Sequence, residues 1–75
     1  MMVDYIVWGD MVRLARHRRK LTQRALADLV GVSSSLIGDI ERGEAVNPSH
    51  TTVIAVCTAL DIDEPPALTV ERGEL

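Results

Sequence analysis

The sequence predicts an all-α fold made of five short helices. Apolar residues recur three and four positions apart in successive segments, which is the period of one face of a helix. Glycine, proline and hydroxyl-bearing residues separate these segments where helices usually begin and end. No strand pattern competes strongly with this interpretation. The chain of 75 residues is long enough for one domain.

The first helix is predicted to run from about Trp8 or Asp10 to Arg19, with Asp10 as a candidate cap. Residues 1–7 are predicted to form an N-terminal tail. The stretch Val3 to Val7 is also compatible with an extended segment that folds over the core or pairs with a second chain, and the sequence leaves these alternatives open. The apolar face of the helix is formed by Trp8, Met11, Val12 and Ala15.

The next two helices form a helix-turn-helix pattern. The second begins after the cap Thr22 and stops at Gly31, and the third runs from Ser33 or the next residue to Gly43. Glycine allows the left-handed conformation that turns the chain sharply. Val32 is expected to fill the space between the two helices, while Ser33 caps the third one.

Proline marks the start of the last two predicted helices. The fourth follows Asn47-Pro48, with Ser49 as its cap, and carries its apolar side chains at helical spacing up to Leu60. A fifth helical turn is predicted near Glu64 to Leu68, opening on two prolines. Residues 69–75 are predicted to be a C-terminal tail, so the domain spans residues 8–68.

The composition excludes several classes of protein. The apolar runs fall short of the ~20 residues that a membrane span requires, and the start of the chain lacks the basic region of a signal peptide. The single cysteine, Cys57, excludes an internal disulfide and a cysteine-cluster zinc site, and it is expected in the core. His17 and His50 have no partner at metal-ligand spacing. We therefore expect a cytoplasmic protein with no cofactor, metal or enzymatic activity.

The charges are distributed unevenly along the chain. Residues 13–42 contain seven basic residues against three acidic ones, whereas the net charge of the whole chain is −3. This asymmetry favours a protein with one anion-facing side on an otherwise acidic body. A solvated helix and loop is the alternative.

Several short motifs occur together between residues 8 and 68. They are Leu21-Thr22-Gln23, Leu26-Ala27, Gly31-Val32-Ser33, Ile40-Glu41-Arg42-Gly43, Asn47-Pro48-Ser49 and Ala59-Leu60. This set resembles the phage repressor and Cro-like helix-turn-helix family, also called the Xre family. The resemblance implies a compact five-helix domain of the lambda-repressor type. It also implies a transcriptional regulator, in particular a repressor, that binds double-stranded DNA at a palindromic operator as a homodimer.

The resemblance assigns roles to individual residues. Arg16 and Glu41 match a partly buried salt bridge that holds the first and third helices together. Gln23 matches a residue that binds a DNA phosphate, and the helix N-terminus beside it suits the same anion. Further phosphate contacts are expected from Arg24, Arg42 and Asn47, although a solvated side chain is an equal alternative for Arg24. Base edges in the major groove are expected to contact Ser33, Ser34, Ser35, Gly38 and Asp39.

This predicted reading surface is small and contains no basic residue. Serine can donate to or accept from any base edge, and Asp39 can accept from a cytosine amino group, but its charge repels phosphate. Gly38 costs about 1 kcal/mol of helix stability relative to alanine. That cost indicates either close approach of another surface or a glycine that is simply tolerated.

The outward face of the predicted fourth helix lacks charge. A solvated helix face normally carries charged residues, so this face favours a dimer interface together with the C-terminal segment. The uncharged outward residues are Thr51, Thr52, Ala55, Thr58 and Ala59.

A second interpretation keeps the fold but makes the domain a protein-interaction module, such as an antitoxin-like or anti-repressor partner.

Overall fold

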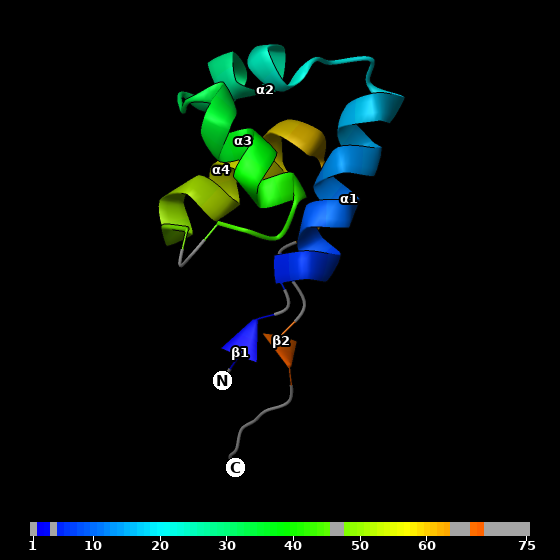
Figure 1. Ribbon diagram of the computed structural model, residues 1–75. Helices are drawn as coiled ribbons and strands as arrows, with labels where there is room; N and C mark the ends of the chain where they lie inside the picture. The colour runs from blue at the N-terminus through cyan, green and yellow to red at the C-terminus, as the bar shows by residue number, and fades with distance from the viewer. Residues whose placement is uncertain (1, 4, 46–47, 64–66, 69–75) are drawn as a thin grey trace.

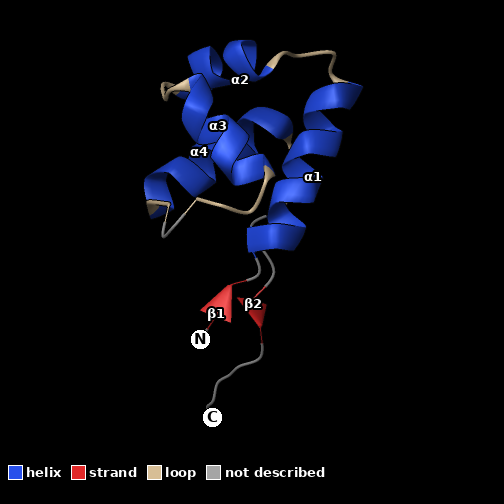
Figure 2. Cartoon of the chain, viewed as in Figure 1, coloured by secondary structure: helices blue, strands red, loops and turns tan. Residues whose placement is uncertain are grey.

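The computed structural model describes residues 2–3, 5–45, 48–63 and 67–68. In these ranges the chain forms four helices and one pair of two-residue strands (Figures 1 and 2). The elements are β1 (Met2–Val3), α1 (Tyr5–Arg18), α2 (Gln23–Val30), α3 (Ser34–Glu41), α4 (His50–Leu60) and β2 (Ala67–Leu68). The predicted all-α class is therefore confirmed, but the described residues form four helices where the sequence predicted five.

Local capping explains where α2, α3 and α4 begin. The hydroxyl of Thr22 accepts from the backbone N–H of Ala25 at 2.9 Å, and Ser33 accepts in the same way from Leu36 at 3.1 Å. Ser49 repeats the arrangement for α4. These three caps agree with the sequence prediction, because each depends only on residues within one turn of the helix start.

The first helix is longer than predicted. It begins at Tyr5, so part of the expected tail is helical, and the predicted cap Asp10 lies inside the helix. The β-prone side chain of Ile6 is 67% exposed, so burial does not explain the extension. Helix α1 is instead fixed by the residues that follow, since Trp8 and Gly9 are buried. Of the stretch Val3 to Val7, Val3 belongs to strand β1 and residues 5–7 are helical, while Asp4 lies outside the described residues.

The fifth helical turn, predicted near Glu64 to Leu68, is not formed at its C-terminal end. Residues 64–66 lie outside the described ranges, and Ala67–Leu68 is a strand. This strand, β2, pairs antiparallel with β1, so that Met2 faces Leu68 in register. The prediction failed because strand pairing joins opposite ends of the chain, whereas proline spacing reports only local preference. Figure 1 shows the pair below the helices.

The core lies where all four helices meet. Helix α3 packs against α1 and α2, and α4 packs against the same two helices. Cys57 is buried, as the sequence predicted, and its sulfur accepts from the indole N–H of Trp8 at 3.3 Å. The core side chains are Trp8, Val12, Ala15, Leu26, Ala27, Ile37, Ile40, Val53, Val56, Cys57 and Leu60. Among the described residues, no helix is long and apolar enough to cross a membrane.

Candidate nucleic-acid interface

A buried ion pair joins α1 to the end of α3. Arg16 Nε donates to Glu41 Oε2 at 2.6 Å, and Arg16 Nη2 donates to Glu41 Oε1 at 3.0 Å. The two side chains are only 10% and 4% exposed. The hydrogen bond to Glu41 raises the pKa of Arg16, and burial opposes that shift without cancelling it. Arg16 therefore stays charged, and its two bonds to Glu41 tie α1 to the end of α3.

The same ion pair positions the N-terminus of α2. Arg16 Nη1 donates to the carbonyl of Leu21 at 2.8 Å, and Gln23 Nε2 donates to Glu41 Oε1 at 3.2 Å. The first turn of α2 is thus held against the last turn of α3. The amide of Gln23 has two N–H donors, so one remains for a phosphate after the bond to Glu41 is made.

Gly38, which was predicted to contact a base edge, is buried in the structure. A Cβ built on Gly38 would lie 3.2 Å from Arg42 Nη1 and 3.6 Å from Gln23 Oε1. The close approach that the glycine indicated is therefore made by the protein's own side chains. The side-chain ends of Arg42 and Gln23 therefore both lie beside Gly38 on the surface of α3.

Arg42 is held by two carboxylates. Its Nη2 donates to Asp39 Oδ1 at 2.6 Å and its Nε donates to Glu44 Oε1 at 2.9 Å. Both bonds raise the pKa of Arg42, and the bond to Glu44 has the larger effect. Asp39, which was predicted as an acceptor for a base, accepts from Arg42 in the structure. Glu44 was not predicted, because sequence spacing does not show how an exposed arginine folds back.

The three predicted serine contacts lie at the start of α3. Ser33 and Ser35 are exposed, and Ser34 is half-buried. The oxygen of Ser33 is occupied by capping, which leaves its O–H free to donate. Arg24 is exposed on the first turn of α2. Asn47, predicted as a phosphate contact, lies outside the described residues.

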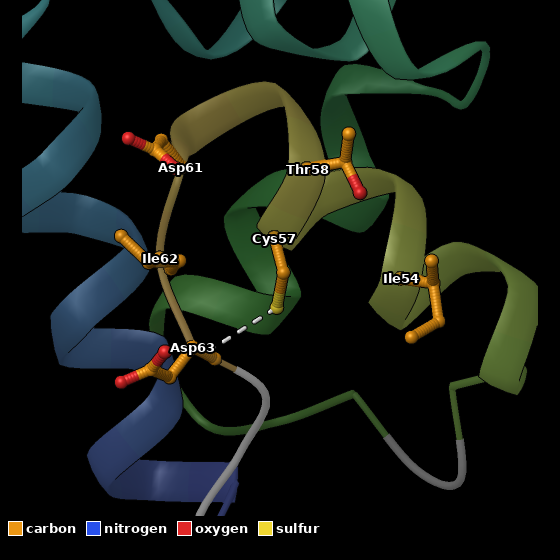
Figure 3. A pocket seen from close by; sticks show the side chains of 6 residues that line it. All are labelled: Ile54, Cys57, Thr58, Asp61, Ile62 and Asp63. Atoms are coloured by element: carbon orange, nitrogen blue, oxygen red, sulfur yellow. Dashed lines mark hydrogen bonds between the residues drawn. The ribbon is translucent and has the colours of Figure 1, made fainter.

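An open hollow of about 430 Å³ lies elsewhere, at the C-terminal end of α4 (Figure 3). Cys57 lies in this hollow, and its S–H donates to the carbonyl of Asp63 at 3.4 Å. The described part of the chain contains no group of three or more His, Cys, Asp or Glu residues that could hold a metal. The hollow is lined by Ile54, Cys57, Thr58, Asp61, Ile62 and Asp63. It shares no lining residue with the surface around Gly38.

The chain is similar to known proteins in sequence and in structure. The chain is 44% identical over 54 residues to the immunity repressor protein of Bacillus phage phi105, an alignment that covers 72% of this chain and 37% of that repressor. The restriction-modification controller protein C.AhdI of Aeromonas hydrophila has a similar structure, with a TM-score of 0.72 and 37% identity over 80% of this chain and 89% of that one.

A third relative was solved with DNA. The P22 c2 repressor, in complex with a synthetic operator, matches with a TM-score of 0.68 and 34% identity over 73% of this chain and 82% of that one. A family model described as a helix-turn-helix domain matches residues 9–69. The match includes the capped turn between α2 and α3 and the buried pair of Arg16 and Glu41. The chain therefore belongs to the helix-turn-helix domain family, of the phage repressor and Cro-like type.

Proposed function

We propose that this chain is a sequence-specific DNA-binding domain of a transcriptional regulator, and that it uses the face formed by α2 and α3. The proposal rests on one observation. The side-chain ends of Gln23 and Arg42 both lie beside Gly38 on α3, the helix that follows the turn. Relatives that are named as repressors, one of them solved with an operator, support the same function. The alignment spans only 37% of the phi105 repressor. The role of that whole protein in transcription therefore applies to this chain only as part of the proposal.

The contacts divide into two groups. Gln23, Arg24 and Arg42 bind phosphates on either side of the groove, with the N–H groups at the start of α2 contributing to the first site. The exposed hydroxyls of Ser33 and Ser35 then reach base edges in the major groove. A phosphate would replace Glu44 as a partner of Arg42, while Asp39 keeps its bond and faces the bases through its second oxygen. Asn47 is assigned to the phosphate group by resemblance alone.

The proposed active form is a homodimer on a palindromic operator. Thr51 and Thr58 are uncharged and exposed on α4, and the half-buried Ala55 lies between them in the sequence. Two copies that meet there would place their α3 helices in successive major grooves about 34 Å apart. The protein would repress transcription if its operator overlapped a promoter. We place a regulator of this kind in the cytoplasm.

Substitution of Arg42 tests this function. We expect Arg42→Ala to weaken binding to the preferred DNA about tenfold, because the change removes a charge-assisted contact and leaves Asp39 and Glu44 facing phosphate. Gln23→Ala should weaken binding to a similar degree. The dissociation constant is measured by fluorescence anisotropy on a labelled duplex. Far-ultraviolet circular dichroism confirms that each variant is folded.

Arg13→Ala is the matched control for Arg42→Ala. Arg13 is an exposed arginine on α1, paired with Asp10 at 3.2 Å, so its removal changes the net charge equally. DNA binding should be nearly unchanged by that substitution. Equal affinity in Arg42→Ala, Gln23→Ala and Arg13→Ala would contradict the proposed face. A wild-type chain that captures a protein partner and binds no DNA would support the interaction module.

A further inference from the structure

The seven basic residues between positions 13 and 42 fall into two groups. Three of them, Arg13, Arg16 and Arg42, donate to carboxylates. Within the part of the chain that the structure describes, no ion pair involves any of the other four. We call those four the basic corner, and they lie at the end of α1, in the following turn and on the first turn of α2. The basic corner consists of Arg18, Arg19, Lys20 and Arg24, all exposed.

The charged groups around the end of α3 do not add up to a net positive charge. Arg42 is bound to both Asp39 and Glu44, so this group of three carries a net negative charge. Glu41 is neutralised by Arg16. A DNA-binding face of this kind needs a source of positive potential, because phosphate neutralisation supplies most of the sequence-independent affinity. The basic corner is the nearest group of cations without a carboxylate partner along the chain.

The structure fixes the basic corner to the reading face. Arg16 donates to the carbonyl of Leu21, which directly follows Lys20, and it also binds Glu41 on α3. Gln23, three residues after Lys20, donates to the same carboxylate. One buried arginine therefore sets the position of the turn after α1 relative to α3. Figure 1 shows this turn joining the end of α1 to α2.

Lys20 has a backbone conformation that favours glycine. Its φ is 56°, and it occupies the position after α1 where the N–H of Leu21 bonds to the carbonyl of Arg16 at 3.1 Å and its own N–H bonds to His17 at 3.0 Å. This bonding pattern is the common helix end in which glycine is usual. A lysine there lowers stability, since only glycine, and less often asparagine or aspartate, adopts the left-handed region readily. Strain of this kind is typical of positions where the side chain has a function.

We propose that the basic corner binds the DNA phosphate backbone beyond the contacts of α3, and that Lys20 keeps its side chain at a positive φ for that contact. This proposal rests on the proposed function, whose reading face it extends. It makes the turn after α1 the main source of salt-dependent affinity. The residues of α3 then contribute mostly to the choice of sequence.

Lys20→Gly separates stability from DNA binding. Relief of the left-handed strain should raise the Tm of the 75-residue chain by about 4–8 °C. Loss of the charge should weaken binding to a 30-base-pair duplex of arbitrary sequence several-fold at low salt. The slope of log K against log salt concentration should become shallower by about 0.9. Anisotropy titrations over a salt series and a thermal melt measure the two effects.

Asp61→Gly is the matched control. Asp61 has a φ of 55° at the end of α4. The N–H of Ile62 donates to the carbonyl of Cys57, just as the N–H of Leu21 donates to the carbonyl of Arg16 at the end of α1. This substitution should raise the Tm without weakening DNA binding. Arg19→Gln should weaken DNA binding and flatten the salt slope without raising the Tm. Lys20→Arg should retain the affinity.

The outcomes distinguish this proposal from the proposed function. A Lys20→Gly chain that keeps the affinity and salt slope of a DNA-binding wild type would overturn the role of the basic corner and leave the face of α2 and α3 intact. A wild-type chain that binds no duplex at low salt would overturn both. A higher Tm together with weaker DNA binding in Lys20→Gly would support the proposed role of the basic corner, provided that Asp61→Gly does not weaken DNA binding.

Discussion

Replacing Arg16 by methionine is expected to lower the free energy of unfolding by about 3–5 kcal/mol. The substitution leaves Glu41, which is 4% exposed, as a buried charge without its partner. It also removes the donor to the carbonyl of Leu21. A chain of 75 residues has a total stability of only roughly 4–11 kcal/mol. Much of the variant should therefore be unfolded at 37 °C, as urea titration followed by circular dichroism would show.

The double variant Arg16→Met with Glu41→Leu is the control for that experiment. Two apolar side chains of similar volume remove the unpaired charge, so most of the lost stability should return. Gln23 would lose one hydrogen bond, and because this residue is half-buried it can bond to water instead. If the single and double variants were equally unstable, packing rather than charge pairing would account for the effect. A single variant as stable as the wild type would contradict the role of the pair.

Gly9→Ala is expected to destabilise the chain by about 3 kcal/mol, at the upper end of the usual cost of overpacking. A Cβ at Gly9 would collide with the carbonyl oxygen of Ile40 and would lie 3.1 Å from that of Glu41. Both atoms belong to the backbone of the last turn of α3, so they cannot move unless the helix moves. The free energy of unfolding in urea measures the loss.

Gly38→Ala is the matched control, because Gly38 is also a buried helical glycine. Its added Cβ would meet the end of the flexible Arg42 side chain at 3.2 Å rather than backbone. The side chain can move aside, and alanine favours the helix by about 1 kcal/mol. Gly38→Ala should therefore be at least as stable as the wild type. Equal losses in Gly9→Ala and Gly38→Ala would contradict close packing of α1 on α3.

The parts of the fold that depend on neighbouring residues could be predicted from the sequence. Thr22, Ser33 and Ser49 cap the helices that follow them, and Gly31 has the positive φ of 85° that ends α2. Each of these features involves only a few consecutive residues. The pairing of Arg16 with Glu41 came from the family resemblance, since nothing local connects residues 25 positions apart.

The parts that were missed depend on contacts between distant segments or on flexible side chains. The first turn of α1 was missed because the residues from Tyr5 to Val7 are β-prone, yet they continue the helix that Trp8 anchors in the core. The pairing of β1 with β2 joins the two ends of the chain. At the site, Glu44 and the position of Arg42 over Gly38 depend on side-chain torsions that no sequence pattern reports. A positive φ at Lys20 was equally unexpected, because glycine is usual there.

Binding-site selection with the 75-residue chain tests most directly whether the face of α2 and α3 recognises a DNA sequence. Genomic fragments are incubated with purified protein at low salt, and the bound fraction is sequenced after several rounds. We expect enrichment of related sequences with two symmetric half-sites about 34 Å apart. We also expect Gln23→Ala to reduce recovery of those sequences. A bound fraction with no sequence above background would contradict recognition of DNA by this face.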